Sequence, residues 1–327
     1  MQQINSSGGM IAIGGVKDKF FGIIRTALFI KPDIIHFDWI ESFYYRRWGW
    51  LTYVSIPSFF LQLFVAKYIC KIRIAFTLHN IFPHDTKNKR LHNWVHTKFM
   101  RQTDAVRVFY TSSIQKVSDL FDVPPVKIKV AVHPHYIQYY PNTISKTEAR
   151  KILSLPEGKK IFLFFGTIRK YKGLDELIYI FNTEQFHESV LLIAGKVHDV
   201  EYANNLIQEL PKNVFIHTEF IKNGDVQKYF NACDAVILPF KNVESSGSVI
   251  LAMGFAKPVI TSSTFAVAEV LKQQEQLLYI DELRSAITAA LKHSTDQLKE
   301  IGRLNFDVIN QNQSAAFSDI FLGLKNR

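Results

Sequence analysis

The sequence predicts an α/β protein built from two doubly wound domains that face each other across a cleft. Short runs of β-branched and aromatic residues alternate with helix-length segments along the chain, which is the pattern of parallel sheets. The 327 residues are enough for two domains of about 150 residues each. A hydrophobic share of 47% supports packed cores and excludes a disordered chain.

Four strands are predicted in the first half of the chain, at Ile34–Phe37, Ile72–Leu78, Ala105–Tyr110 and Ile128–Val132. The segment Trp48–Ile69 is rich in apolar residues but is interrupted by Pro57, Gln62 and Lys67. A membrane span needs about 20 mostly apolar residues, so we expect a buried helix with an aromatic face. Contact of that face with a bilayer surface stays open.

A domain junction is expected at Tyr139–Lys160, where prolines and a glycine surround a short charged helix. A second series of strands follows, at Ile161–Phe165, Val190–Ala194, Val214–His217, Ala235–Leu238 and Pro258–Thr261. Two sheets of this kind give the predicted two-domain architecture.

The loop Gly166–Gly173 is the most informative segment of the chain. It follows a strand-length apolar run, carries Arg169 and Lys172, and leads into a segment with helical periodicity. Ligands of open α/β sheets bind beyond the carboxyl ends of the strands, and Arg with Lys suits a phosphate or diphosphate there. A solvated loop is the alternative interpretation of the two cations when they are considered alone.

The formal net charge of +10 and the pI near 9.4 favour an anionic partner, whether nucleic acid, an anionic membrane or a phosphorylated substrate. The basic residues are spread along the chain without a recognition motif, so a nucleic-acid partner is disfavoured. Two distant cysteines, Cys70 and Cys233, exclude a disulfide framework and indicate a reducing cytoplasm. The spacings of His36, His79, His84, His133 and His135 match no metal-ligand signature.

The second half of the chain resembles the donor-binding domain of retaining glycosyltransferases of family 4, which have the GT-B fold. The resemblance rests on the Gly166–Gly173 loop, on Asp234–Pro239, and on Glu244–Met253 running into Lys257–Ile260. The first half is similar at Pro32–His36 and Thr77–His84. The resemblance implies an acceptor-binding domain at residues 1–145, a donor-binding domain at 146–305, and a C-terminal helix at 306–327 that packs back on the first domain.

Site residues follow from the same resemblance. It implies that Arg169 and Lys172 stabilise the leaving diphosphate, that His79 reaches the donor sugar, and that His36 and His84 are acceptor-side candidates. The donor-binding set that it implies is Gly166, Arg169, Lys172, Ile221, Glu244, Ser246, Gly247, Ser248 and Glu269. A helix that begins after Ser246 would add backbone N–H groups, although the serine would serve equally as an ordinary cap.

The chain departs from the family pattern in two places. Family members commonly carry two glutamates separated by seven residues, and the second contacts the ribose. Glu244 is followed at that spacing by Ala252, and alignment on Met253 instead pairs Val243 with Leu251, so the second glutamate is missing by either alignment. Glu244 is therefore a sugar-site candidate with a solvated loop carboxylate as its alternative. Only about thirty residues precede Ile34, so we expect a shortened acceptor-binding domain.

We expect a metal-independent, retaining transfer of a hexose from a nucleotide sugar to a glycan or lipid-linked acceptor, in polysaccharide or glycoconjugate synthesis. The nucleotide sugar is a co-substrate, and no cofactor or metal is expected because an Asp-x-Asp pair is missing. The expected location is the cytoplasm, with peripheral attachment to the inner membrane face through the aromatic Phe43–Phe64 region. The alternative is a non-catalytic nucleotide-sugar-binding subunit of a transferase complex.

Overall fold

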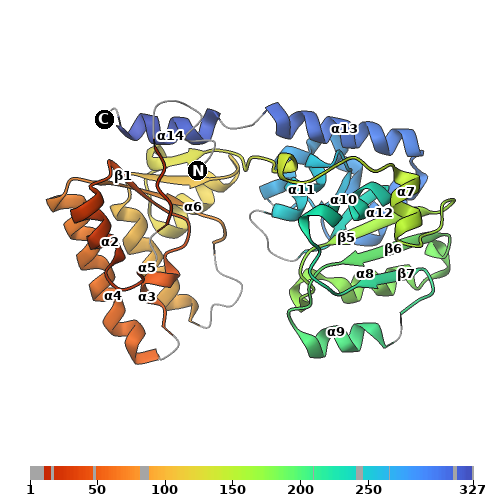
Figure 1. The fold of residues 1–327 in the computed structure, drawn as a ribbon, viewed down its shortest axis with the longest axis horizontal. Helices are drawn as coiled ribbons and strands as arrows, with labels where there is room; N and C mark the ends of the chain where they lie inside the picture. The colour runs from red at the N-terminus through yellow and green to blue at the C-terminus, as the bar shows by residue number, and fades with distance from the viewer. Residues whose placement is uncertain are drawn as a thin grey trace. The chain divides into compact units, whose positions relative to one another are not determined.

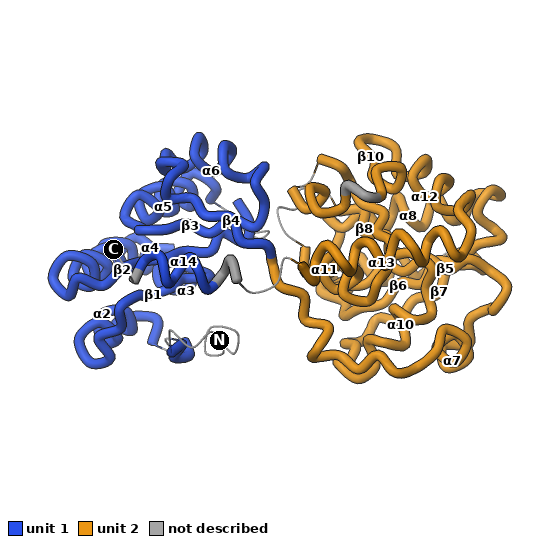
Figure 2. The backbone as a smooth tube through the Cα atoms, turned by 90° about the horizontal axis from the view of Figure 1, so that it is seen from above, with its two compact units in different colours: residues 1–132, 314–327 blue, residues 133–313 orange. Residues whose placement is uncertain are grey.

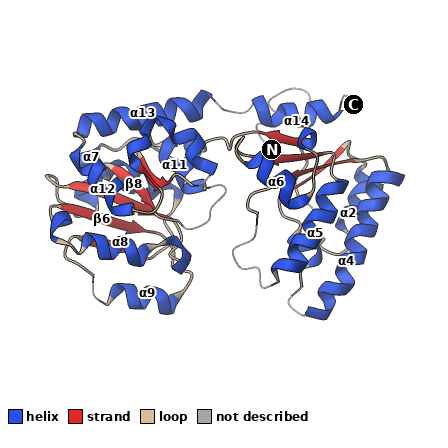
Figure 3. Ribbon diagram, turned by 180° about the vertical axis from the view of Figure 1, so that it is seen from behind, coloured by secondary structure: helices blue, strands red, loops and turns tan. Residues whose placement is uncertain are grey.

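The computed structural model describes residues 11–15, 18–46, 49–81, 88–208, 210–240, 246–264, 266–311 and 315–325. The chain folds into two compact units, which are coloured separately in Figure 2. Unit 1 comprises residues 1–132 and 314–327, and unit 2 comprises residues 133–313. Residues 133–145 therefore group with unit 2, whereas helix α14 (Ala315–Lys325) groups with unit 1. Both units alternate helices with parallel strands (Figures 1 and 3).

The sheet of unit 1 has the order β1-β2-β3-β4, with every neighbouring pair parallel. Its strands are β1 (Ile34–Phe37), β2 (Arg73–Thr77), β3 (Ala105–Val108) and β4 (Ile128–Val130). The helices of this unit are α2 (Gly22–Arg25), η1 (Thr26–Ile30), α3 (Glu41–Tyr44), α4 (Gly49–Phe64), η2 (Val65–Ile69), α5 (Lys89–Gln102), α6 (Ser113–Phe121), η3 (Pro125–Lys127) and α14. All four strands lie where the sequence predicts them.

Helix α4 and its continuation η2 turn an apolar face outward. Trp50, Tyr53, Val54, Leu61, Phe64 and Tyr68 are each more than half exposed and recur at helical spacing. We call these six residues the α4 stripe. The buried face contains Phe59 and Leu63, which pack in the core, together with Gln62, whose amide donates to the Phe20 carbonyl at 2.7 Å. The expectation of a buried helix with an aromatic face is therefore right for Phe59 and wrong for the stripe.

The combined helix Gly49–Ile69 is long and apolar enough to cross a membrane by composition, with 39% of its most apolar window buried. One such helix is weak support for a membrane-spanning segment, because a core helix can be equally long and apolar. Gln62 and Phe59 anchor this helix to the rest of unit 1.

The sheet of unit 2 has six parallel strands in the order β10-β9-β8-β5-β6-β7. These are β5 (Lys160–Phe165), β6 (Ser189–Ala194), β7 (Val214–His217), β8 (Ala235–Leu238), β9 (Val259–Ser262) and β10 (Leu278–Tyr279). Five of the six match predicted strands. The sixth, β10, has two residues and leaves no alternating pattern in the sequence.

Helices connect these strands and cover the sheet. They are η4 (Ile137–Tyr139), α7 (Lys146–Ile152), η5 (Lys170–Lys172), α8 (Leu174–Phe181), η6 (Glu184–Phe186), α9 (Val200–Ile207), η7 (Asn223–Asp225), α10 (Val226–Ala232), α11 (Gly247–Gly254), η8 (Ala266–Leu277), α12 (Leu283–Lys292) and α13 (Thr295–Gln311). Residues 161–164 of β5 and 190–194 of β6 are completely or almost completely buried, because helices lie on both faces. This explains why these strands are continuous apolar runs.

Strand order reverses at β5, which is the first strand of unit 2. The next strand in the chain, β6, lies on one side of β5, whereas β8 lies on the other. Such a reversal is the point at which open α/β sheets bind ligands, outside the carboxyl ends of the strands. We therefore expect the ligand site to lie between the segments that follow β5 and β8.

Candidate functional site

Three loops converge at the carboxyl end of β5. Gly166, directly after β5, has φ of +143°, and Gly195, directly after β6, has φ of +153°. A Cβ atom on Gly195 would lie 2.0 Å from the Gly166 carbonyl oxygen, and one on Gly173 would lie 2.5 Å from the Pro239 carbonyl oxygen. Only glycine, which has no Cβ atom, permits approaches this close. These glycines therefore allow the loops after β5, β6 and β8 to pack directly against one another.

Lys172 points back into this convergence from η5. Its side chain is buried, and its Nζ donates to the Thr167 hydroxyl at 3.1 Å. The Nζ lies 5.1 Å from the centre of the Phe240 ring and 5.9 Å from that of Phe164. Burial, with a smaller contribution from the charge on Arg169, lowers the pKa of Lys172 to about 8. Burial makes the charged form of this ammonium unfavourable, so an anion that binds beside it would stabilise the charge.

Arg169 is fixed by the path of its loop. Ile168 is buried, its N–H donates to the Lys196 carbonyl at 2.9 Å, and its own carbonyl accepts from the His198 N–H at 3.2 Å. These bonds hold the Gly166–Gly173 loop against the loop after β6. Arg169 is half-buried and adopts an extended backbone at the start of η5. Both predicted cations therefore lie on one loop that backbone hydrogen bonds hold against its neighbour.

The amino terminus of α11 supplies the third component. The Ser246 side chain caps the helix by accepting from the Val249 N–H at 3.3 Å. Gly247 and Ser248 form the first turn, where N–H groups have no partner within a helix. A Cβ on Gly166 would lie 3.3 Å from the Ser248 hydroxyl and 3.0 Å from the Lys172 Nζ. The helix start and the cationic loop therefore lie close together beside Gly166, and together they can hold a diphosphate.

Other predicted donor residues lie on neighbouring loops. Ile221 is half-buried between β7 and η7, and Glu269 is half-buried in the first turn of η8, after β9. Both segments follow the carboxyl ends of their strands in the same parallel sheet. Glu244 and His84 lie outside the residues that the structure describes.

His79 forms a close pair with Asp38 in unit 1. Its Nε2 donates to the Asp38 Oδ1 at 2.9 Å, and its ring stacks on Trp39 at 4.8 Å between centres. Burial raises the pKa of Asp38, but the hydrogen bond from His79 and the nearby His36 reverse this, and the net pKa is below its ordinary value. The neighbouring His36 shares a 2.8 Å hydrogen bond, through its Nε2, with the Thr77 hydroxyl. These groups stand at the carboxyl ends of β1 and β2.

Asp38 is a functional candidate that the sequence interpretation missed. It is 41 residues from its partner His79, and only the parallel pairing of β1 with β2 brings the two strand ends together. Its position one residue after a predicted strand was the available signal, because parallel strands end at a shared edge.

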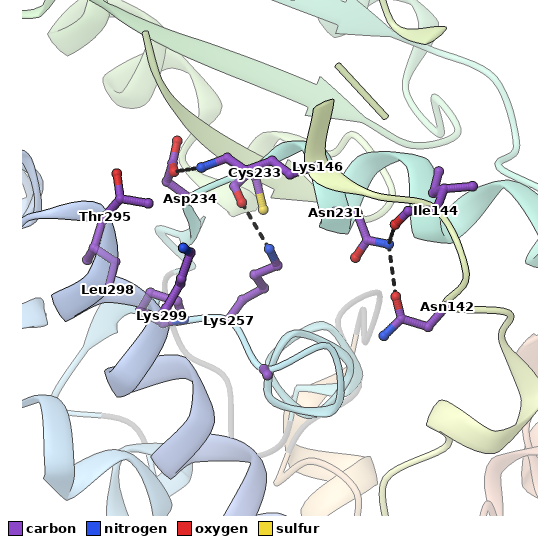
Figure 4. A pocket seen from close by; sticks show the side chains of 12 residues that line it. Asn142, Ile144, Lys146, Asn231, Cys233, Asp234, Lys257, Thr295, Leu298 and Lys299 are labelled. Carbon is purple, nitrogen blue, oxygen red and sulfur yellow. Dashed lines mark hydrogen bonds and ion pairs between the residues drawn. The ribbon is translucent and has the colours of Figure 1, made fainter. Parts of the chain in front are cut away.

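A pocket of about 240 Å³ in unit 2 lies elsewhere (Figure 4). It is lined by residues that immediately precede β8 and β9, among them Asp234 and Pro258, and is therefore at the amino edge of the sheet. Asp234 pairs there with Lys146, and the Lys257 Nζ donates to the Cys233 carbonyl at 3.0 Å. These interactions hold α7, β8 and the start of β9 together, so we assign the pocket a structural role.

Comparison with known proteins gives a family match and a similar relative. Residues 145–301 match the family model described as Glycosyl transferases group 1. The GDP-mannose:glycolipid 4-beta-D-mannosyltransferase of Xanthomonas campestris pv. campestris is 23% identical over 281 residues, which cover 84% of this chain and 75% of that protein.

Two solved structures share the fold. A glycosyltransferase from Rickettsia africae has a TM-score of 0.71 at 14% identity, with 99% of this chain and 86% of that chain covered. Anabaena HepE in complex with UDP-glucose has a TM-score of 0.70 at 15% identity, with 94% and 82% covered. The predicted α/β class with two parallel sheets and the GT-B resemblance are confirmed, whereas assignment to family 4 stays a prediction.

Proposed function

We propose that this chain transfers a hexose to a glycan or lipid-linked acceptor. The premise is that it is a nucleotide-sugar-dependent glycosyltransferase, with a glycosyl transferases group 1 domain at residues 145–301. The product would be a cell-surface polysaccharide or glycoconjugate. The observation that carries this proposal is that Lys172 and Ser248 both lie beside Gly166, at the point where strand order reverses.

Charge at the leaving group explains how this site would act. As the bond to the sugar breaks, negative charge develops on the nucleoside diphosphate, and fixed cations stabilise that charge with little reorganisation. Lys172 and Arg169 would contact the diphosphate oxygens, and the α11 amino terminus would donate backbone N–H groups. These groups supply the positive charge that a divalent ion supplies in metal-dependent transferases, so we propose that transfer is metal-independent.

The donor and acceptor are proposed from the relatives. The Xanthomonas relative carries GDP-mannose and glycolipid in its name, and the HepE structure contains UDP-glucose. A nucleoside diphosphate hexose is common to both names. We propose GDP-mannose as the first donor to test, with UDP-glucose as the second.

For the stereochemical course we propose retention, as the family 4 resemblance implies. A specific observation favours a second candidate, transfer with inversion. In the His79–Asp38 pair the His79 Nε2 lies 2.9 Å from the Asp38 carboxylate, which fixes the orientation of the imidazole. An imidazole oriented by a carboxylate can act as a general base. An inverting transfer needs such a base to take the proton from the acceptor hydroxyl, whereas retention can use the leaving diphosphate.

Attachment to a membrane is proposed for unit 1. The α4 stripe exposes aromatic and aliphatic side chains, and Lys31 and Lys71, at the ends of η1 and η2, are exposed. Helices η1 and η2 contact each other, so the basic ends lie on adjacent segments. An anionic bilayer surface suits both features, and the proposed location is the cytoplasmic face of the cell membrane.

One experiment tests the donor site and the course of the reaction together. The purified protein is titrated with GDP, UDP, ADP, CMP and dTDP in the presence of EDTA, and melting temperature is recorded for wild type and Arg169→Ala. One diphosphate should stabilise the wild type and not the variant. The matching nucleotide sugar is then supplied with a lipid-linked acceptor, and NMR assigns the anomeric configuration of the product.

Stabilisation without release of nucleoside diphosphate would favour the non-catalytic subunit instead. Failure of every diphosphate to stabilise the protein would overturn the donor-site assignment.

A further inference from the structure

Two histidines and a glutamate form a buried cluster in unit 1 that the transfer reaction does not use. His92 and His96 lie one turn apart on α5, so both side chains project from the same face of the helix. Glu41 is the first residue of α3, which follows β1. Both imidazoles are almost completely buried, at 4% and 2% exposure, and the Glu41 side chain is 24% exposed.

The three side chains converge on a small volume. The Glu41 Oε1 lies 3.1 Å from the His96 Nε2 and 3.9 Å from the His92 Nδ1. The ligand atoms of all three residues lie within 4.8 Å of one another. Two nitrogens bound to Zn²⁺ at about 2.05 Å with tetrahedral angles are separated by roughly 3.3 Å, so the cluster needs only small side-chain shifts to enclose the ion.

The side chains of the cluster are of the right kind for a metal site. Two imidazoles and one carboxylate are the protein ligands of a His₂Glu zinc site, which keeps its fourth position for water. The two histidines and the glutamate offer this set from two helices, with their ligand atoms within 4.8 Å of one another.

We propose that Glu41, His92 and His96 bind one Zn²⁺ ion in unit 1, with water as the fourth ligand. The His96 Nε2 shares a hydrogen bond with Glu41, and the His92 Nδ1 shares a long one, at 3.5 Å, with the Tyr44 hydroxyl. The two imidazole rings lie 3.9 Å apart between centres. A shared ion gives both rings and the carboxylate a common partner. The site goes beyond the proposed transferase function, and it is separate from the diphosphate-binding loop of unit 2.

The ion would cross-link two helices of unit 1. It would join α3 to α5, two elements whose ligands are 55 residues apart in the chain. Glu41 stands three residues after Asp38, and α3 begins directly after the segment that carries Trp39, the ring stacked on His79. Zinc binding would therefore rigidify the turn that positions the His79–Asp38 pair, without contact with the transferred sugar.

The direct test is zinc binding to the full chain after chelator treatment and removal of the chelator. Isothermal titration with Zn²⁺ alone, and elemental analysis after gel filtration, should give one ion per chain with a dissociation constant of about 1 µM or tighter. Co²⁺ in place of Zn²⁺ should give the visible absorption of a four-coordinate site. Substoichiometric binding, or Co²⁺ that remains octahedral, would overturn the proposal.

Three variants locate the ion. Loss of a residue that only hydrogen-bonds to a metal ligand lowers metal affinity by about 10–100-fold. His92→Gln, His96→Gln and Glu41→Gln each remove a ligand itself and should weaken Zn²⁺ binding by more than that. Glu41→Gln keeps an acceptor for the His96 N–H and is the variant expected to fold normally. The control is His187→Gln, an exposed histidine of unit 2, which should bind like wild type.

A second readout separates this proposal from the donor-site proposal. Diphosphate-induced stabilisation, which depends on unit 2, should be unchanged in Glu41→Gln. Equal Zn²⁺ affinity in Glu41→Gln and wild type would disprove the site even if diphosphate binding is intact. If the wild-type protein binds one Zn²⁺ ion but no diphosphate, the donor-site proposal alone is wrong.

Discussion

Gly166 and Lys172 meet at the carboxyl end of β5, where a Cβ atom on the glycine would lie 3.0 Å from the lysine Nζ. The same Cβ would lie 3.3 Å from the Ser248 hydroxyl, so this glycine leaves room for the ammonium beside the start of α11. The relationship explains why a glycine and a lysine six residues apart belong to one site. It also fixes what a substitution at either position should do.

Gly166→Ala should impair both stability and diphosphate binding. The φ of +143° is strained for a residue with a side chain, which costs about 1–3 kcal/mol, and the added methyl group displaces the Lys172 Nζ. Chemical denaturation and diphosphate titration measure the two effects. Gly158→Ala is the control, since a Cβ there meets nothing within 4 Å. Unchanged diphosphate affinity in Gly166→Ala would remove this loop from the site.

Diphosphate affinity should fall as pH rises through about 8. Burial lowers the pKa of Lys172 to about 8, so the charge that attracts the diphosphate is present below that pH and lost above it. Titrations from pH 7 to 9.5, in buffers of different ionisation enthalpy, should also detect proton uptake on binding near pH 8. Lys172→Arg keeps its charge over this range, and its affinity should show a flatter pH profile. The same slope in both proteins would contradict the assignment.

Asp38→Asn distinguishes the two stereochemical courses. If His79 is the base of an inverting transfer, losing the carboxylate that orients it should lower kcat by roughly 10²–10⁴-fold while the donor dissociation constant stays unchanged. If transfer proceeds with retention and needs no base, kcat should change little. Steady-state kinetics and donor binding are the measurements. A parallel loss of donor binding would indicate a structural role for Asp38 instead.

Asp234→Ala should destabilise unit 2 far more than removal of a surface ion pair. The Asp234 Oδ2 accepts from the Arg150 Nη2 and from the Ile161 N–H, each at 2.8 Å, and both charged side chains are about 95% buried. Breaking a buried pair leaves a buried charge without a counter-charge, so we expect a loss of about 3–5 kcal/mol in unfolding free energy. Glu300→Gln, at an exposed pair with Arg303, should leave the free energy of unfolding almost unchanged, because water and salt screen exposed ion pairs. Urea denaturation would measure both, and similar losses would refute the structural role of Asp234.

The α4 stripe should bind membranes. The triple variant Trp50→Ser, Tyr53→Ser, Phe64→Ser removes three exposed aromatic side chains and should reduce binding to vesicles of anionic phospholipid by about tenfold or more in flotation assays. Tyr179→Ser is the control, because Tyr179 is 69% exposed on unit 2. Salt should weaken wild-type binding as well, because basic residues contribute. Equal flotation of the triple variant and the control would disprove the proposal.

Strands were predictable because the sheets are covered on both faces. β5 and β6 consist almost entirely of buried apolar side chains, so each strand is a continuous apolar segment that can be recognised in the sequence without knowing which strands pair with it. Helix α4 is the opposite case. Its composition predicts burial, yet the structure exposes Trp50 and Tyr53 and buries Gln62, because the Gln62 amide satisfies a backbone carbonyl of a distant segment.

By itself, the sequence determined the α/β class, the positions of nine strands and the cationic loop that ends in Gly173, because each is a local pattern of burial, charge or backbone freedom. Only the tertiary structure decided which distant groups meet: Ser248 with Gly166, Asp38 with His79, and Glu41 with His96. Those contacts depend on strand order and on helix packing. No local pattern encodes either one, since the partners are brought together by surfaces that become buried only when the whole unit folds.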